Sequence, residues 1–384
     1  MANLTISANG INKIETAKFA TKPEFQPKEA EAAKSVKEFS KGTNALYSYF
    51  MGGQSLTFGG TSGFKIKKLE DVPCPCCGQI MLTPSSTEKH VNRLKMAKGN
   101  KLADRIKNEE AKFLRSNERC AAFIIADAAK NTELNLSGAV TKANKNLPER
   151  FNTYCQDVLL HTALLCEEQS GENSPAYNYL MEKAENVSDH ESFYRPNITE
   201  EFSQFKSSMT EEQYNKLEDE LMTLPLDYKN VSRFMTEAQG KGTVTIANNL
   251  YAPALATAEH VRPHSLGGSN KASNFLSECA GCNNPRSSLS YVEWFKVHPE
   301  FKRNAQEYIE HVESRIVNGE LPTTYDSYPV DIRKTLTNES EGHIVLRVLD
   351  KEKLVELREA KKQGIEPDIH AETEKANKEE ENEN

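Results

Sequence analysis

Two close pairs of cysteines contain the residue types best suited to binding a metal ion. The first pair lies in the sequence CPCCG at 74–78 and the second in CAGC at 279–282. Thiolates separated by two residues can occupy two corners of a tetrahedral Zn²⁺ site, and two more donors are then required. A proline that stiffens the first turn and a glycine that permits its tight backbone are typical of a zinc knuckle. The sequence therefore predicts one structural zinc ion bound by Cys74, Cys77, Cys279 and Cys282.

The spacing of these cysteines also permits different roles. Cys76 competes with its neighbours as a ligand, and common zinc ribbons separate their cysteine pairs by only roughly 15–20 residues. Here the pairs are much farther apart, so a large helical insertion has to lie between them. A cluster of reactive surface thiols is one alternative. A cysteine redox protein is another, but the Asn after Cys282 and the lack of a thioredoxin-like βαβ pattern argue against it.

The stretch from 258 to 286 holds further groups that could act together. It contains an adjacent acid and histidine (Glu259 and His260), the loop PHSLGG at 263–268, Asn274, and the second cysteine pair followed directly by Asn283 and three residues later by Arg286. Phosphodiester hydrolysis requires a base that takes a proton from water, a cation that offsets charge on the phosphate, and help for the departing oxygen. A histidine, a hard cation with its ligands and a fixed basic side chain could supply these.

In this order the residues resemble the signature of the HNH nuclease superfamily, the ββα-metal nucleases. That signature is an acidic residue and His, a Pro-x-Ser-x-Gly-Gly loop, a central Asn, and a CxxC followed at once by Asn or His, with Lys or Arg three residues later. Every element is present, and the resemblance is confined to 258–286. It implies a β-hairpin packed on a helix around a catalytic ion, with the structural zinc pinning the hairpin.

The resemblance also implies a role for each matching residue. His260 is expected to act as the general base, since an imidazole titrates near physiological pH. Glu259 and Asn283 are expected to offer oxygen ligands to a catalytic Mg²⁺ or Mn²⁺ ion. Arg286 is expected to contact phosphate, because a guanidinium group can bind two phosphate oxygens. Asn274 is expected to brace the loop between the two strands as structural support.

The implied function is that of a metal-dependent endonuclease that hydrolyses phosphodiester bonds in DNA, with double-stranded DNA as its partner. A protein of another class fits the same residues. It would be a catalytically inactive zinc-containing protein that binds DNA or a protein partner and uses the HNH residues only for structure. Intact Glu259, His260 and Asn283 favour the enzyme.

Composition and charge are compatible with this function. The chain of 384 residues is long enough for one large or two ordinary domains. Its net charge of −8 would argue against a nucleic-acid partner, but the charge is segregated. The stretch 88–119 holds 10 basic and 5 acidic residues, whereas 351–384 holds 7 basic and 11 acidic ones. We expect the basic stretch to lie against a duplex backbone, where it would add affinity that does not depend on base sequence.

The sequence predicts neither a membrane segment nor an export signal. Its apolar runs are far shorter than the roughly 18 residues of a membrane-spanning helix. Its start lacks the basic-then-apolar order of a secretory signal. We therefore expect a cytoplasmic protein without a membrane partner. In that reducing compartment, close cysteine pairs are more often metal ligands or redox sites than disulfides.

The surrounding patterns predict a mainly helical α+β protein with disordered termini. The expected parts are a flexible N-terminal arm (1–73), the first zinc knuckle with a helical insertion (74–242), the HNH module with its following helices (243–320), and a C-terminal segment with a charged tail (321–384).

Local signals place several elements within these parts. Capping boxes at Ser85, Thr210 and Ser290 predict helix starts, and the sequence TVTI at 243–246 predicts a short strand. The isolated cysteines lie in apolar helical stretches and are expected to be small core residues; they are Cys120, Cys155 and Cys166.

Overall fold

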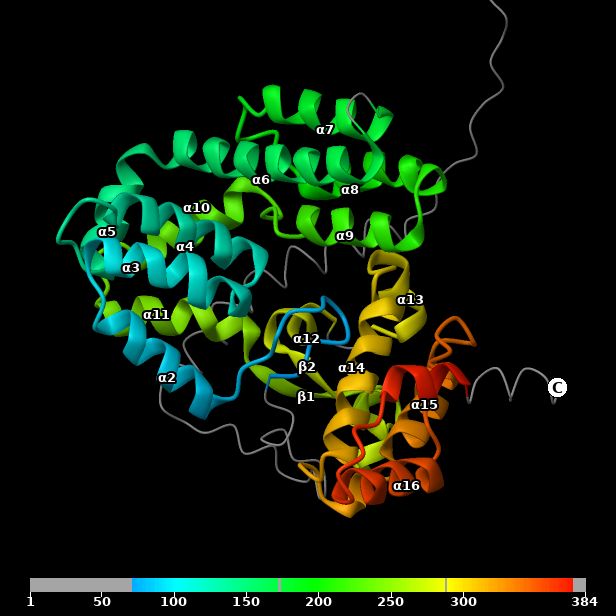
Figure 1. Cartoon of the computed structure of the whole chain (residues 1–384). Coiled ribbons are helices and arrows are strands. Elements are labelled where there is room, and N and C mark those ends of the chain that lie inside the picture. Colours follow the sequence, from blue (N-terminus) through cyan, green and yellow to red (C-terminus); the bar gives the residue numbers. More distant parts are fainter. Residues whose placement is uncertain (1–70, 172–173, 287–288, 376–384) are drawn as a thin grey trace, which may run out of the picture. The chain divides into compact units, whose positions relative to one another are not determined.

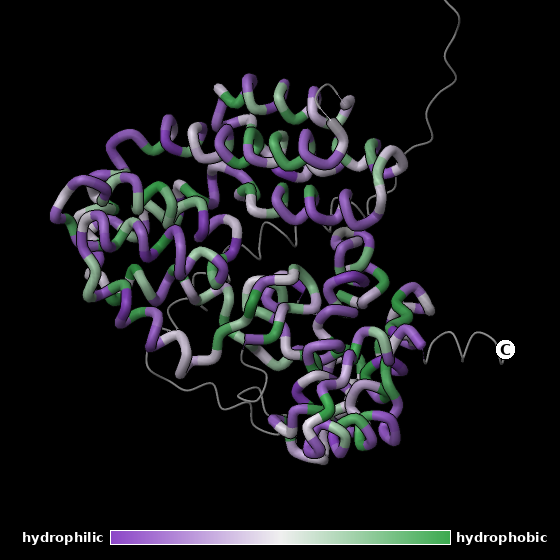
Figure 2. The backbone as a smooth tube through the Cα atoms, in the orientation of Figure 1, coloured by the Kyte–Doolittle hydropathy of each residue, from purple (hydrophilic) through white to green (hydrophobic). Residues whose placement is uncertain are grey.

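A computed structural model of the chain describes residues 71–171, 174–286 and 289–375 (Figure 1). Nearly all of the predicted N-terminal arm (1–73) lies outside these residues. The described part consists of helices and one two-stranded antiparallel sheet, which confirms the mainly helical α+β class. Most helices carry both hydrophobic and hydrophilic residues (Figure 2), as expected where one face is buried. In this part of the chain, no helix combines the length and the apolar character needed to cross a membrane.

The helices that precede the sheet share one hydrophobic core. Its members include Ile125, Phe151, Leu217 and Leu250, none of which has exposed surface. Helices thus occupy most of the chain from Pro84 to Tyr251. They are α2 (Pro84–Lys95), α3 (Gly99–Arg105), a short π-helix (Ile106–Glu110), α4 (Ser116–Ala129), α5 (Leu136–Ala143), α6 (Leu147–Ser170), α7 (Pro175–Glu185), α8 (Arg195–Phe202), α9 (Glu211–Leu221), α10 (Tyr228–Ala238) and α11 (Thr243–Tyr251).

Local capping explains where several helices begin. The capping boxes predicted at Thr210 and Ser290 are present at the starts of α9 and of α13 (Tyr291–Val297). For α2 the predicted position is wrong, because the capping residue is Thr83 rather than Ser85. The residue after Thr83 is Pro84, and proline is favoured at the first position of a helix because it has no amide hydrogen to leave unpaired.

The strand predicted at 243–246 is wrong, since these residues begin helix α11. The β-branched residues there favour a strand, but four apolar residues between 246 and 251 recur at helical spacing. These are Ile246, Ala247, Leu250 and Tyr251, and all four are buried in the first core. Packing of this face outweighs the local preference for a strand.

The two strands form a short hairpin that belongs to a second hydrophobic core. Strand β1 (Ala256–His260) pairs with β2 (Phe275–Cys279), so that Ala256 lies opposite Cys279 at one end and His260 lies opposite Phe275 at the other. Helix α12 (Ala280–Arg286) follows β2 directly (Figure 1). The strand–strand–helix order agrees with the expectation from the sequence.

The remaining helices complete the second core. They are α13, α14 (Phe301–Val317), α15 (Tyr328–Glu339) and α16 (Lys351–Lys362). The apolar face of α14 is buried and includes Tyr308, Ile309 and Val312. Gly319 follows this helix with a left-handed φ of 71°, a conformation in which glycine commonly ends a helix.

The expectation of a disordered C-terminus is wrong for residues 351–375. In α16, Leu354 is fully buried and Leu357 nearly so. The guanidinium group of Arg358 pairs with the carboxylate of Asp326. Its Nε also donates to the carbonyl oxygen of Ile316 at 2.8 Å. Two leucines one turn apart and one paired arginine thus attach this helix to the second core, although most of its other positions are charged. Residues 376–384 lie outside the described part.

The isolated cysteines are core residues, as predicted. Cys120 lies in α4, and Cys155 and Cys166 lie in α6; all three have no exposed surface. Their role is therefore one of packing.

Candidate functional site

The four predicted zinc ligands meet in one cluster. Their sulfur atoms lie within 4.8 Å of one another, and those of Cys77 and Cys279 are 3.8 Å apart. Zn–S bonds of about 2.3 Å in a tetrahedron require sulfur separations of about 3.8 Å, so the spacing fits. Cys74, Cys279 and Cys282 are buried and Cys77 is half-buried. The cluster can therefore hold a structural metal ion such as zinc, as the sequence predicts.

Backbone hydrogen bonds bring the two distant cysteine pairs together. Just after the first knuckle, Leu82 donates to the carbonyl oxygen of Ala254 at 3.0 Å and accepts from the amide of Ala256 at 2.8 Å. These bonds fix the first knuckle beside the start of β1. Because β1 pairs with β2, the cysteines at the end of β2 arrive at the same place. These backbone hydrogen bonds hold the two ends of the helical insertion side by side.

Hydrogen bonds within the cluster favour the thiolate, the form in which cysteine binds metal, at Cys77. The thiols of Cys279, Cys282 and Cys74 hydrogen-bond to Cys77 and hold its pKa well below the usual value. The backbone amide of Cys279 donates to the sulfur of Cys74 at 3.4 Å. Burial raises the pKa of Cys74, and hydrogen bonds with the neighbouring thiols raise that of Cys282. Metal binding at these two residues therefore has to displace a proton from each thiol.

A basic residue that the sequence patterns do not single out also lies against the cluster. Nη2 of Arg115 donates to the sulfur of Cys282 at 3.5 Å. The arginine is so close to Gly281 that a Cβ at that glycine would lie 1.7 Å from Nη1. Its positive charge offsets the negative charge that four thiolates leave even after a divalent ion binds. Only the basic excess over 88–119 points toward this residue in the sequence.

At the opposite end of the hairpin, His260 is half-buried beside Phe275, with 4.2 Å between ring centroids. Its Nε2 lies 3.1 Å from Oδ1 of the exposed Asn270. An amide oxygen only accepts hydrogen bonds, so with the Asn270 amide assigned in this orientation the proton lies on Nε2, and Nδ1 is the nitrogen that can accept one. A proton-accepting imidazole therefore lies at the partly exposed end of the hairpin.

The loop after His260 is fixed by the buried side chain of Asn274. Its Oδ1 accepts from the amide of Arg262 at 2.8 Å, and its Nδ2 donates to the carbonyl oxygens of Arg262 and Ser269 at 3.0 and 2.8 Å. Gly268 has to be glycine, because a Cβ there would lie 1.8 Å from the carbonyl oxygen of Arg262. These contacts close the loop between the two strands.

Glu259 and Arg286 form an ion pair in the interior. The guanidinium group of Arg286 also donates to the backbone carbonyl oxygens of His260 and Leu289 and lies over the ring of Tyr291, 4.5 Å from its centroid. Arg286 has no exposed surface. This corrects the expected contact of Arg286 with phosphate. The arginine instead holds Glu259 and the end of β1, because acceptors inside the protein engage both of its terminal nitrogens.

Asn283 lies on the same face of β1 as Glu259. Its Nδ2 donates to Oγ1 of Thr257 at 2.8 Å, and side chains two residues apart in a strand, such as those of Thr257 and Glu259, point to one face. The Thr257 hydroxyl donates in turn to the carbonyl oxygen of Glu278 at 2.7 Å. These bonds orient the amide of Asn283 and leave Oδ1 as the atom that could bind an ion.

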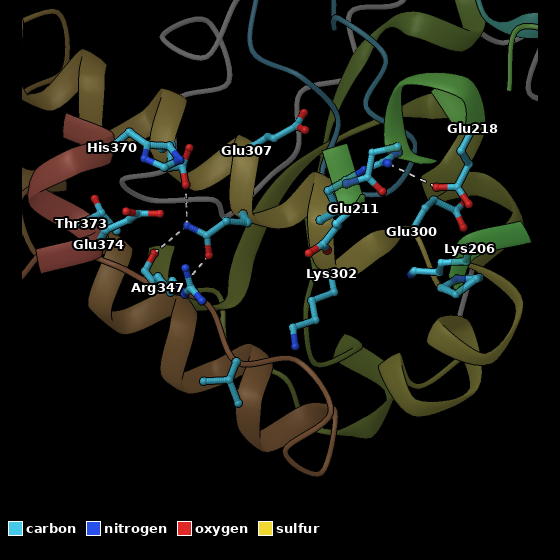
Figure 3. A pocket seen from close by; sticks show the side chains of 16 residues that line it. Lys206, Glu211, Glu218, Glu300, Lys302, Glu307, Arg347, His370, Thr373 and Glu374 are labelled. Atoms are coloured by element: carbon cyan, nitrogen blue, oxygen red, sulfur yellow. Dashed lines mark hydrogen bonds and ion pairs between the residues drawn. The ribbon is translucent and has the colours of Figure 1, made fainter. Parts of the chain in front are cut away.

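A pocket of about 630 Å³ lies elsewhere, next to α9 and α14 (Figure 3). Charged and polar residues line it, and several pair with one another; for example, Nη1 of Arg303 lies 3.2 Å from the carboxylate of Glu218. None of the ligands or catalytic residues predicted from the sequence lines this pocket. The pocket is therefore separate from the chemistry of the hairpin.

Comparisons with known proteins identify no relative. No protein family, curated protein or solved structure matches this chain. The functional interpretation therefore depends on the residues and their arrangement.

Proposed function

We propose that this protein is a metal-dependent endonuclease of the HNH type that hydrolyses phosphodiester bonds in DNA. The observation that carries the proposal is the hairpin and helix at 256–286. This unit brings a proton-accepting His260, the carboxylate of Glu259 and the amide oxygen of Asn283 onto β1 and α12. A base and two oxygen ligands are the groups that metal-assisted hydrolysis requires.

His260 is the proposed general base. With the amide oxygen of Asn270 facing Nε2, the proton would lie on Nε2, and Nδ1 would take the proton from the attacking water. The bonds of Asn274 fix the loop that begins beside the histidine. A base held in this way supplies about 10²- to 10⁴-fold in rate.

Glu259 and Asn283 are the proposed ligands of a catalytic Mg²⁺ or Mn²⁺ ion, since hard cations prefer oxygen ligands. Such an ion would offset the charge that develops on the phosphate. The carboxylate of Glu259 would then be shared between the ion and Arg286. In this proposal Arg286 is a positioning residue that orients Glu259.

The four-cysteine cluster is proposed to hold zinc in a structural role. Four thiolates fill a tetrahedral zinc ion and leave no position for water or substrate. The ion would pin the start of the hairpin to the first knuckle, and so keep β1 in register with β2.

The duplex is proposed to contact the basic stretch that contains α2 and α3. Lys98 and Lys101 are exposed there, whereas Arg105 is half-buried and donates to the carbonyl oxygen of Arg93 at 2.8 Å. Reversing Lys98, Lys101 and Arg105 to Glu should weaken binding to all duplexes alike and flatten the salt dependence by roughly 0.9 in slope per lost phosphate contact. Binding curves over a salt series measure this. An unchanged slope would show that these side chains make no phosphate contacts.

Incubation of the purified protein with supercoiled plasmid tests the activity. We expect nicked or linear DNA with Mg²⁺ or Mn²⁺ and none with a chelator. Double-stranded and single-stranded substrates should be compared, because the proposed partner is the duplex.

A second candidate function is that of an inactive, zinc-containing DNA-binding or partner-binding protein. The ion pair between Glu259 and Arg286 favours it, because one proposed ligand of the catalytic ion already has a buried partner. Wild-type protein that binds DNA but never cuts it with either metal, over varied substrates, would support this candidate and contradict the nuclease.

A further inference from the structure

A buried carboxylate lies beside the cysteine cluster without a hydrogen-bond partner in the described part of the chain. Glu278, in β2, has no exposed surface. Neither of its carboxylate oxygens has a hydrogen-bond partner among the described residues. Burying an unpaired carboxylate is costly, so such a group is expected to bind a proton or a metal ion.

Two thiols lie within reach of this carboxylate. The sulfurs of Cys76 and Cys282 and a carboxylate oxygen of Glu278 are all within 4.8 Å of one another, and the three residues are buried. Cys282 also belongs to the four-cysteine cluster. Cys76 is held in place by its own backbone, whose carbonyl oxygen accepts from Nδ2 of Asn304 at 2.7 Å. The position between the two cysteines of the first knuckle is thus occupied by a third thiol that points inward.

We propose that Cys76, Glu278 and Cys282 form a second zinc site, which shares the sulfur of Cys282 with the four-cysteine cluster. The two sulfurs and the carboxylate provide three of the four ligands of a tetrahedral zinc ion, and a water molecule would be the fourth. Binding of Zn²⁺ displaces the proton of Cys76 and any proton on Glu278 to solvent. Two divalent ions would then be bound by five thiolates and one carboxylate, with Arg115 as a neighbouring positive charge.

The competing possibility is a protonated Glu278 beside a single ion. Burial, followed by the charge of Cys77, raises the pKa of Glu278 to about 8. A neutral carboxyl would remove the cost of the buried charge without a second ion. The two possibilities differ in the number of ions per chain.

Measurement of zinc per chain in the purified holoprotein tests the proposal. We expect two ions in the wild-type protein and one in each of Glu278→Gln and Cys76→Ser. Cys166→Ser is the matched control, since it removes a buried thiol of α6 that belongs to neither site, and it should retain two ions. Melting curves of all four proteins establish that each variant is folded.

One ion per chain in the wild-type protein would overturn the proposal and support the protonated carboxyl. Two ions retained by both variants would also overturn it, because the second ion would then lie elsewhere. Loss of both ions from both variants would show one inseparable site and would overturn it as well. Timed removal of zinc from the wild-type protein by a chelator needs no variant. It should release the ions in two steps of one equivalent each, and a single step of one equivalent would contradict the second site.

Discussion

At one end of the β1–β2 hairpin, Ala256 lies opposite Cys279 beside the cysteine cluster, whereas at the other end His260 lies opposite Phe275. The cluster offers soft sulfur donors that are mostly withdrawn from solvent. The far end offers an imidazole that solvent can reach, next to an exposed loop. Enclosed soft donors suit an ion that stays in place, and a reachable base suits a reacting water. One short hairpin thus connects a structural end with an end capable of chemistry.

The strongest way to break this comparison is to remove a sulfur from the structural end. In zinc-finger peptides, structural zinc contributes about 10–16 kcal/mol of apparent binding energy, and this energy is part of folding. Cys279→Ser should therefore lose zinc and unfold the hairpin and its surroundings. Zinc content and near-ultraviolet circular dichroism measure the two effects.

Cys166→Ser serves as the control for that variant, since it replaces a buried cysteine outside the cluster. It should keep its zinc and its folded hairpin. Full zinc content and an unchanged melting temperature in Cys279→Ser would show that the cluster does not hold the fold together.

Arg286 combines a property of each end of the hairpin, because its side chain is charged and yet fully buried. Replacement of one partner of a buried ion pair leaves an uncompensated charge and costs about 3–5 kcal/mol. Arg286→Met should lower the free energy of unfolding by this amount in urea titrations, and a second change, Glu259→Gln, should recover part of the loss. As a control, Arg262→Ala affects an exposed arginine 3.8 Å from Glu339 and should cost less than about 1 kcal/mol. Equal effects of Arg286→Met and Arg262→Ala would argue against the interior role.

Changes in α16 are expected to have a smaller effect, because this helix supports the second core from outside the hairpin. Leu354 is fully buried, and its replacement by Ala should cost about 2–5 kcal/mol of unfolding free energy. The neighbouring Val355 is 37% exposed, and Val355→Ala should stay within about 0.5 kcal/mol of the wild type. Urea titrations of both variants measure the two changes in unfolding free energy. A negligible loss in Leu354→Ala would restore the expectation of an unpacked tail.

The sequence predicts the cysteine cluster better than the other parts of the site, because the spacing within each cysteine pair is a local signal. Cysteine spacing alone identifies Cys74, Cys77, Cys279 and Cys282, and the structure brings their sulfurs together. Spacing cannot reveal the contact of Arg115, which depends on how the start of α4 packs against the second knuckle. The sequence does not predict the burial of Arg286 for the same reason, since the exposure of a side chain depends on the packing of the whole core.

Secondary structure shows the same limit. The helical faces of α9 and α14 follow from periodic leucines and aromatic residues, and both are buried. The stretch 243–246 misleads because its four β-branched residues do not reveal the face formed with Leu250 and Tyr251. Helix α16 escapes prediction because only Leu354, Leu357 and Arg358 are buried in a charged sequence.

The rate of plasmid cleavage by His260→Ala, compared with the wild type at equal DNA occupancy, tests the proposed chemistry most directly. Because His260 is half-buried and its side chain holds no ion pair in the described part of the chain, this variant should keep the fold, the zinc and the DNA affinity. Its cleavage rate with Mg²⁺ should fall by about 10²- to 10⁴-fold. Excess Mg²⁺ or Mn²⁺ should not restore it, whereas Asn283→Ala, which removes a proposed metal ligand, should recover in part. Normal cleavage by His260→Ala would contradict the assignment of this histidine as the base.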